Sequence, residues 1–577
     1  TLLTFIVFGY NITFNYIIFD VPKVIFENPH IMSGLTPENI YWTFTTPNFG
    51  LYQPLPNLSF MIDSDLFGSW PGGFHTMTLV WHIVCMCLFF WVMLQLTGNF
   101  AAVFAATLLM SIHPVQILTV SQIATRHEIM ETVFMLLSIE AYRRYVVHKS
   151  RRAYCFSLFF MCLGMLCKQI IFMLPILLLM LDYWPLDRVA LSFRSPLETL
   201  RAVLRLMLEK TPYFVLSVIA VVLAIVGKSQ FKLVEAGIKR LSLSESGYIA
   251  VTGYARYIGH LVYPIRIGYF TVAGEQPSFT FFMLSAFLFI LLTTLALALL
   301  WKRPYIGVGW FWFVFYMLPA SGVLRYGIES IALRYMYISA MGLYLAFCIG
   351  LYDFSVWLQQ RISKKPKNTP PIWYWMTIGA LTITLFGLTF WQHGFFRDTE
   401  NMAKRVLAIT DDRSVFGHIM LGFIREDQRL YEEANFHFRK CIEIEPEYVL
   451  FRYYYADSLM RENRFQEAID VATEALEKDP DHTDFLVLSG VAKMNLKRFE
   501  EAETDLRRAV EVEPDNTKAL HNLSYTLALL GDFAQARELN KQVLLLEPDN
   551  YLAKTLAEQL NWSIPSPEVN ESRETAP

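Results

Sequence analysis

The stretch RFQEAIDVATEALEKDPDHTDFLVLSGVAKMNLKRFEEAETDLRRAVEVEP, residues 464–514, contains the same pattern twice at an interval of 34 residues. Each copy begins with an Arg-Phe pair and ends with an acidic residue followed by proline. The proline recurs at this interval along the C-terminal part of the chain, at Pro446, Pro480, Pro514 and Pro548. An aromatic residue and an alanine recur in step with it, at Tyr431, Phe465, Phe499 and Phe533 and at Ala434, Ala468, Ala502 and Ala536. This region is therefore predicted to be an array of one repeated structural unit.

A 34-residue period with an alanine in the second helix and a proline at the end is typical of tetratricopeptide helix pairs. Alignment on the prolines places small residues where the two helices of a unit come closest, at Gly422, Ala456, Gly490 and Ser524. We predict four full repeats over about 415–549 within a repeat domain of 414–562, a capping helix over 550–560, and a disordered tail over 563–577. Four repeats exceed the roughly three needed for stability and form a concave groove. The groove is predicted to hold an exported protein or peptide, and a rigid spacer or a subunit-docking arm is the alternative.

The region before the repeats is strongly apolar. The chain is 54% hydrophobic with a mean hydropathy of +0.34, and its apolar residues are concentrated in residues 1 to about 391. This composition excludes a soluble protein and predicts a polytopic transmembrane helix bundle over 1–391, joined to the repeats by a linking helix within 392–413. We expect about eleven spans, near 1–13, 77–97, 99–112, 129–146, 153–167, 168–182, 212–227, 279–301, 304–321, 335–358 and 372–391. The chain begins with Thr1 inside an apolar run, so its start is expected to be incomplete.

The distribution of Lys and Arg predicts the orientation in the membrane. Basic runs occur at 143–152, 188–210, 302–303 and 361–367, and all four fall on one side, which is therefore predicted to be the cytoplasm. The long connections 14–76 and 228–277 then lie on the exoplasmic side. The last span delivers the repeats to the same side, which is the periplasm if the membrane is a bacterial inner membrane. The repeats carry more acidic than basic residues, which is typical of a solvated surface.

Ionisable residues at a membrane edge are costly and often functional. The residues singled out on this ground are Arg126, Glu128, Lys168, Arg256 and Arg334. Asp63-Ser64-Asp65 resembles a metal-binding DxD motif, but such a pair alone is a weak signal. None of the seven cysteines belongs to a cluster with ligand spacing, so neither a disulfide framework nor a metal site is expected.

Several stretches carry a resemblance to a known family. They are NPHIMSGLTPENIYWTFTTPNFGLYQPLPNLSFMIDSDLFGSWPGGFH (28–75), HPVQILTVSQIATRHE (113–128), LCKQ…LPILLLMLDYWPLDR (166–188), GYARYIGHLVYP (253–264) and ESIALRYMYIS (329–339). In this order, and followed by repeats, they resemble the tetratricopeptide-containing transmembrane O-mannosyltransferase family and its bacterial relatives. That family is similar in fold to GT-C-type glycosyltransferases, which move a sugar from a polyprenyl-phosphate carrier to an acceptor at the outer membrane face.

The resemblance implies roles for individual residues. Asp20 occupies the place of the first of two adjacent acids in the first outer loop and is the candidate catalytic base. Arg334 and Arg256, followed by Lys168 and Arg126, are the candidates for binding the donor phosphate, with Glu128 in support. The sequence departs from the family at four polar positions, which here are Val21, Gln116, Leu118 and Leu333.

Two classes of function therefore remain. The first is a membrane glycosyltransferase that uses a polyprenyl-phosphate sugar as donor and requires no further cofactor, metal or nucleic acid. The second is a catalytically degenerate membrane scaffold whose repeats mediate protein–protein interaction in a larger envelope assembly. The retained Asp20, Arg256 and Arg334 favour the first class, and the lost acidic positions favour the second.

Overall fold

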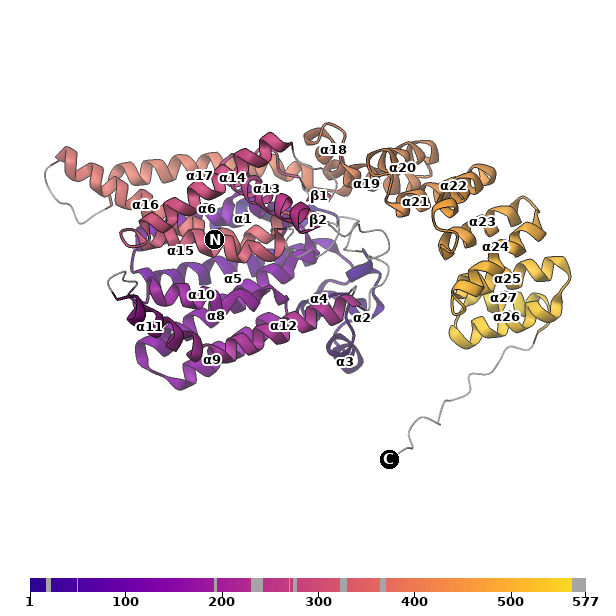
Figure 1. The fold of residues 1–577 in the computed structure, drawn as a ribbon, viewed down its shortest axis with the longest axis horizontal. Helices are drawn as coiled ribbons and strands as arrows, with labels where there is room; N and C mark the ends of the chain where they lie inside the picture. The colour runs from indigo at the N-terminus through magenta and orange to yellow at the C-terminus, as the bar shows by residue number, and fades with distance from the viewer. Residues whose placement is uncertain are drawn as a thin grey trace, which may run out of the picture. The chain divides into compact units, whose positions relative to one another are not determined.

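The computed structural model describes residues 1–16, 22–48, 50–190, 195–229, 242–268, 270–272, 278–321, 329–363 and 370–562. The contacts divide the chain into two compact units, Thr1–Gly417 and His418–Pro577. Both units are built almost entirely of helices (Figure 1). The predicted all-α fold, a helical bundle followed by a tetratricopeptide array, is confirmed, whereas the likeness to the GT-C fold stays a prediction.

The first unit contains the apolar helices. From the N-terminus these are α1 (Leu2–Phe8), α2 (Pro29–Met32), α3 (Pro37–Thr45), α4 (Pro54–Phe67), α5 (Pro71–Thr97), α6 (Phe100–Ile112), α7 (Ile117–Ser121), α8 (Arg126–His148), α9 (Arg151–Met165), α10 (Leu174–Tyr183), α11 (Pro196–Glu209), α12 (Thr211–Ser229) and α13 (Leu243–Val262). They are followed by α14 (Phe279–Leu299), α15 (Pro304–Met317), α16 (Met336–Ser363), α17 (Ile372–His393) and α18 (Thr399–Ile409). Many begin with proline in their first turn, where the missing N–H group has no helical partner to lose.

The bundle is organised around a few helix pairs. Helix α8 packs against α9 and α5, and α16 packs against α15 and α6. Helices α15 and α16 approach closely at two glycines, since a Cβ on Gly309 would lie 2.4 Å from the carbonyl oxygen of Gly342. Small residues at such crossings are typical of helices packed within a membrane.

Both connections predicted as outer loops contain helices. Residues 14–76 include α2, α3 and α4, and residues 228–277 include α13. Strand β1 (Phe270–Val272) pairs antiparallel with β2 (Glu329–Ala332), with Phe270 opposite Ala332. This short ribbon joins the second connection to the segment that carries Arg334.

Length and composition identify fewer spans than predicted. Among the described residues, four helices could cross a membrane: Pro71–Thr97, Phe279–Leu299, Leu333–Ile362 and Ile372–Phe396. Two bent pairs, Phe100–Ile112 with Pro114–Ser121 and Pro196–Glu209 with Thr211–Val226, raise the number to six if each pair is one span. Helix α8 is outside this group because it carries several charged residues, yet its 23 residues give it a length of about 34 Å, close to the hydrocarbon thickness of about 30 Å. The count of about eleven therefore stays a prediction.

The repeats follow the predicted pairing. They comprise α19 (Val415–Asp427), α20 (Tyr431–Ile444), α21 (Val449–Arg461), α22 (Phe465–Lys478), α23 (Thr483–Asn495), α24 (Phe499–Val512), α25 (Thr517–Leu530), α26 (Phe533–Leu546) and the capping helix α27 (Tyr551–Gln559). A Cβ on Gly422 would lie 2.5 Å from the ring of Phe438, and one on Gly490 would lie 2.6 Å from Leu506. The small residues thus stand at the closest contact between the paired helices, as predicted. The tail 563–577 lies outside the described residues.

Candidate functional site

Three of the predicted site residues come together at the beginning of α8. Lys168 forms an ion pair with Glu128 in which both side chains are largely buried. The Lys168 ammonium lies 4.6 Å from the ring centroid of Tyr335, and the guanidinium carbon of Arg334 lies 5.3 Å from the same centroid. Tyr335 therefore holds two cations around one aromatic ring.

Two further titratable residues belong to this group. The Nε2 atom of His127 lies 3.7 Å from a carboxylate oxygen of Glu128, and both Lys168 and Arg334 interact electrostatically with the His127 ring. Glu131, one turn further along α8, is fully buried and also interacts with Lys168 and Glu128. Sequence reasoning missed both residues, although their spacing on a helix that begins at Arg126 places them near Glu128. We call His127, Glu128, Glu131, Lys168, Arg334 and Tyr335 the Lys168 cluster.

Lys168 reaches this position because the chain reverses tightly after α9. The backbone N–H groups of Cys167 and Lys168 both donate to the carbonyl oxygen of Gly164, at 2.9 Å. A Cβ on Gly164 would lie 2.3 Å from Cδ1 of Ile171, so a larger residue would require the Ile171 side chain to move. Lys168 itself has extended backbone angles and precedes the short helix η5 (Gln169–Met173).

The first outer connection lies against this reversal. The Gln169 side chain donates to the carbonyl oxygen of Tyr52 at 2.6 Å, and the N–H of Leu55 donates to the carbonyl oxygen of Leu166 at 3.2 Å. The connection that precedes α4 is therefore fixed next to Lys168.

Arg126 is enclosed by protein groups at the start of α8. It is fully buried and forms an ion pair of 2.5 Å with Asp63, which is also fully buried. Its remaining N–H groups donate to Thr78, Ser59 and the carbonyl oxygen of Phe74, at 2.7 to 3.1 Å. The Arg126 guanidinium therefore bonds to groups on α4 and α5, and the expectation that Arg126 binds a donor phosphate stays a prediction.

The DxD-like pair separates into two environments. Asp63 faces Arg126, and burial raises the pKa of the Asp63 carboxyl to about 6 although the guanidinium opposes this shift. Asp65 is exposed and accepts a hydrogen bond of 3.0 Å from the N–H of Leu35. The two carboxylates do not share a ligand, and among the described residues no group of three or more His, Cys, Asp or Glu side chains could hold a metal ion.

Arg256 lies on α13, with its guanidinium carbon 5.7 Å from the ring centroid of Phe281. The next residue, Tyr257, is buried and accepts a hydrogen bond of 3.0 Å from the N–H of Ala332. Ala332 ends β2, two residues before Arg334. Helix α13 is thus linked to the Lys168 cluster through Tyr257. One turn after Arg256, burial lowers the pKa of His260 to about 4, and the Arg256 charge adds to this effect.

Asp20 lies outside the described residues, as does Val21. The described residues on either side of them, Tyr16 and Phe26, have stacked rings with centroids 4.9 Å apart. Phe26 packs in turn against Phe74, 5.1 Å away, whose carbonyl oxygen accepts a hydrogen bond from Arg126. The flanks of the predicted base therefore lie close to the start of α8.

The other departures from the family pattern are buried. Leu118 and Leu333 are each 3% exposed, and Gln116 is completely enclosed. Leu333 directly precedes Arg334 in the short helix η8 (Leu333–Tyr335), so an apolar side chain stands beside the cluster where the resemblance expects an acid.

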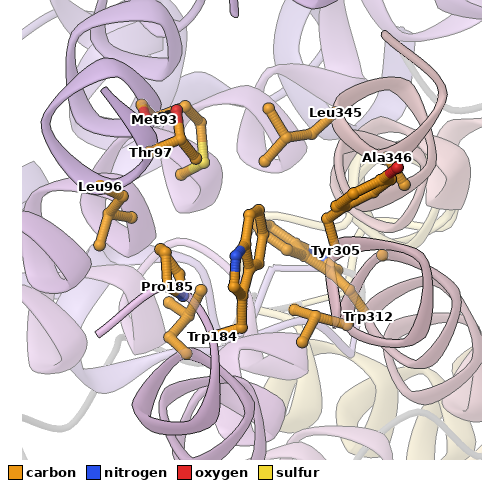
Figure 2. A pocket seen from close by; sticks show the side chains of 13 residues that line it. Met93, Leu96, Thr97, Trp184, Pro185, Tyr305, Trp312, Leu345 and Ala346 are labelled. Carbon is orange, nitrogen blue, oxygen red and sulfur yellow. Dashed lines mark hydrogen bonds between the residues drawn. The ribbon is translucent and has the colours of Figure 1, made fainter. Parts of the chain in front are cut away.

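A separate apolar pocket lies far from this cluster. Figure 2 shows it between the end of α5, the Trp184-Pro185 segment and helices α15 and α16, with Met93, Leu96, Tyr305 and Trp312 among its lining residues. Thr97 in this pocket and Phe74 beside Arg126 lie on the same helix, about 35 Å apart at a rise of about 1.5 Å per residue. The pocket is therefore not part of the charged site.

Comparisons with known proteins support the repeats and add one local similarity. A family model described as "Tetratricopeptide repeat" matches residues 493–560, and one described as "Anaphase-promoting complex, cyclosome, subunit 3" matches residues 427–509. A segment of 120 residues, 21% of this chain, is 28% identical to "Protein O-mannosyl-transferase Tmtc1" of Drosophila melanogaster and spans 14% of that protein's length.

Solved structures of repeat proteins are also similar. The "First TPR of Spaghetti (RPAP3) bound to HSP90 peptide SRMEEVD" is 26% identical, with 20% of this chain and 90% of that chain covered and a TM-score of 0.19. YrrB, "a TPR protein with an unusual peptide-binding site", is 18% identical, with 32% and 91% covered and a TM-score of 0.25. The family models show that the chain carries tetratricopeptide repeats, and it also has apolar helices typical of membranes and a local similarity to an O-mannosyltransferase.

Proposed function

We propose that this protein is a membrane glycosyltransferase that moves a sugar from a polyprenyl-phosphate carrier to a protein hydroxyl group. The observation that carries the proposal is the convergence of Lys168 and Arg334 on the ring of Tyr335, beside His127 and Glu128. A phosphate leaving group needs cationic side chains that are fixed before the reaction, because they then stabilise the developing charge without reorganisation. Arg334 suits this role through its planar, forked donors, and Glu128 fixes the position of the Lys168 ammonium.

The reaction requires one further group. Asp20 takes the proton of the acceptor hydroxyl as that oxygen attacks the anomeric carbon of the sugar. The new carbon–oxygen bond forms while the bond to the carrier phosphate breaks, and the carrier leaves as polyprenyl phosphate between Lys168 and Arg334. The similarity to Tmtc1 supports a hydroxyl acceptor and a mannosyl donor. The Lys and Arg distribution supports a site and repeats on the exoplasmic side, which is the periplasm in a bacterial inner membrane.

The repeats deliver the acceptor or a partner protein. Tetratricopeptide arrays present a concave surface suited to an extended peptide, and a tethered array raises the local concentration of its ligand near the membrane.

Intact-mass analysis of exported proteins tests this function in cells that express the wild type, Asp20→Asn, or the double variant Lys168→Met/Glu128→Gln. The double variant replaces both members of the ion pair with neutral side chains of similar size, so neither member is left as an unpaired charge. We expect sugar masses with the wild type that are absent with both variants. Lys302→Met, which alters an exposed lysine before α15, is the matched control and retains them. Identical masses in all four strains and in a deletion strain exclude the transferase.

A second candidate is the degenerate scaffold. It is favoured by Leu118 and Leu333, which are buried apolar residues where the resemblance expects polar ones, and by the ion pair between Arg126 and Asp63. In that case no variant of the Lys168 cluster alters any sugar mass, while removal of residues 414–577 changes the size of the envelope complex on native gels.

A further inference from the structure

Helix α11 exposes an apolar stripe that no other described part of the first unit covers. Leu197, Leu200, Leu204, Met207 and Leu208 are each 40–72% exposed. Their spacing of three and four residues places them on one side of the helix. The opposite side carries Leu206, which is 8% exposed and faces the protein. The stripe is thus a second apolar face, separate from the one that packs.

Basic residues line one edge of this stripe. Arg201 and Arg205 are exposed and one turn apart, and at about 100° per residue both fall beside Leu208 and Leu197. Leucines on one face with arginines at its edge are typical of helices that lie in the interface of a membrane.

Helix α12 also has an exposed apolar face. Its exposed apolar residues include Val215, Val218, Ile219, Val222, Ile225 and Val226. Helices α11 and α12 therefore each present an exposed apolar face.

The two helices cannot form one straight span. Helix α12 alone has 19 residues, about 28 Å, which is close to the hydrocarbon thickness, and α11 adds 14 residues, about 21 Å. The chain bends by 59° between them. If α12 crosses the bilayer, α11 must turn towards its surface.

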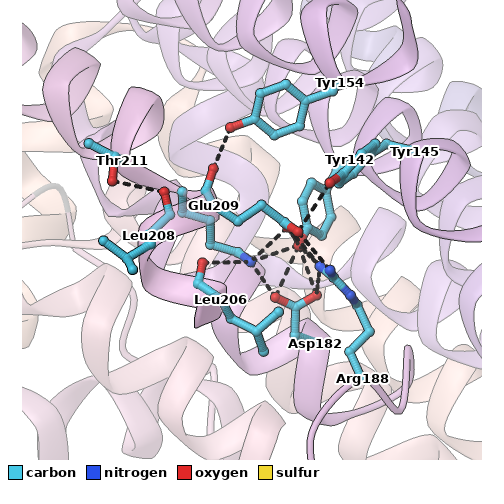
Figure 3. Close-up of polar contacts among 10 residues, drawn as sticks. Tyr142, Tyr145, Tyr154, Asp182, Arg188, Leu206, Leu208, Glu209 and Thr211 are labelled. Atoms are coloured by element: carbon cyan, nitrogen blue, oxygen red, sulfur yellow. Dashed lines mark hydrogen bonds and ion pairs between the residues drawn. The ribbon is translucent and has the colours of Figure 1, made fainter. Parts of the chain in front are cut away.

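A buried polar network fixes this bend (Figure 3). Lys210, fully buried between the two helices, donates to the hydroxyl oxygen of Tyr142 at 2.7 Å and forms an ion pair with the buried Asp182. Glu209 accepts hydrogen bonds of 2.8 and 2.7 Å from the two terminal nitrogens of Arg188. The negative charges of Asp182 and Glu209 are neutralised by the positive charges of Lys210 and Arg188. The bend is therefore held from α8, α10 and the segment after α10, and the direction of α11 is fixed.

We propose that α11 is a membrane-surface helix that inserts its leucine stripe between lipids and binds anionic phospholipid headgroups through Arg201 and Arg205. The occupant of the stripe is the leaflet that surrounds α12. This inference does not depend on the glycosyltransferase activity.

The test uses the full-length protein in nanodiscs, with a nitroxide attached at Leu204→Cys or, as the matched control, at the exposed Glu198→Cys. The exposed Cys87 and Cys155 are first replaced by serine. The expected result is that dissolved oxygen relaxes the label at 204 more than an aqueous nickel chelate does, with the opposite order at 198. Equal access of nickel to both labels overturns the proposal. The proposal is also overturned if the label at 204 is shielded from both oxygen and the nickel chelate and this shielding is lost on dilution. In that case a second copy of the protein, and not lipid, covers the stripe.

The headgroup contact has its own measurement. Native mass spectrometry compares retention of phosphatidylglycerol with retention of phosphatidylcholine by the wild type, Arg201→Gln and Arg205→Gln. Each change should reduce the preference for phosphatidylglycerol about fivefold. Arg151→Gln, an exposed arginine at the start of α9, serves as the control. An unchanged preference in both variants, or an equal loss in the control, overturns the role of these arginines.

Discussion

The guanidinium of Arg126 lies 2.5 Å from the carboxylate of Asp63, and both side chains are fully enclosed between α4, α5 and α8. An enclosed pair of this kind stabilises a fold only while both partners are present, because a single charge left behind has no solvent. The pair therefore joins the first outer connection to the helix that carries Glu128.

Replacing Arg126 should consequently unfold the first unit before it affects chemistry. We expect Arg126→Met and Asp63→Asn each to reduce the free energy of unfolding by about 3–5 kcal/mol, measured as the loss of folded protein in a denaturing detergent titration. Asp65→Asn, two residues away and exposed, should change it by less than about 0.5 kcal/mol. If Arg126→Met folds normally but loses sugar transfer, the phosphate-binding role first expected for Arg126 is supported.

Arg334 should behave as a phosphate ligand. Its forked donors match a phosphate in a way that a lysine ammonium does not. In proteoliposomes supplied with a polyprenyl-phosphate sugar, we expect Arg334→Gln to lower kcat by about 100- to 1,000-fold and Arg334→Lys to recover only part of this loss. Arg303→Gln removes an exposed arginine that pairs with Asp353 and should leave the rate unchanged. If the Arg334→Gln variant has the same kcat as the wild type, Arg334 does not bind the donor phosphate during the reaction.

The third repeat should not tolerate a methyl group at Gly490. A Cβ there would lie 2.6 Å from Cγ of Leu506, so Gly490→Ala should destabilise a fragment of residues 414–562 by about 1–3 kcal/mol. Replacing Leu506 as well creates the missing space, and the double variant Gly490→Ala/Leu506→Ala should lose less than the sum of the two single changes. The second repeat already contains this combination, since Ala456 and Ala472 share one core there. Additive losses in urea unfolding would show that the two residues do not interact.

Glu445 should make the repeats less stable at neutral pH. Burial raises the pKa of this carboxyl from 4.5 to about 7. Because the folded state holds the proton more tightly, stability is highest below pH 4.5 and falls as the pH rises from 4.5 to about 7. Glu445→Gln should therefore raise the melting temperature at pH 8 and have little effect at pH 4, with a gain on the order of 1 kcal/mol after allowance for solvent screening.

Glu513 provides the matched control for this measurement. It occupies the equivalent position two repeats later, is exposed, and accepts a hydrogen bond of 2.9 Å from Asn516. Glu513→Gln should not stabilise the fragment at any pH. A gain for Glu445→Gln that is the same at pH 4 and pH 8 would contradict titration of Glu445 as the cause.

The sequence by itself determined the features that depend on local patterns. The 34-residue period predicted the helix pairs and their closest contacts at Gly422 and Gly490, because both follow from spacing along one chain. The apolar runs likewise predicted a helical membrane domain, and most of the predicted spans fall on helices. The number of helices that cross could not be predicted in this way, since α8 places its charges inside the bundle.

Only the tertiary structure decided which charged residues lie together. Arg126, Lys168 and Arg334 are equivalent as membrane-edge cations in the sequence, but Arg126 forms an ion pair with Asp63, which is distant along the chain, whereas Lys168 pairs with Glu128. His127 and Glu131 became part of the cluster because Lys168 returns to α8 after a tight reversal. The basic run 188–210 predicted an orientation in the membrane from the sequence, but only the structure showed that the leucines of α11 are exposed. Burial and pairing depend on contacts between distant segments, and these arise only when the helices pack.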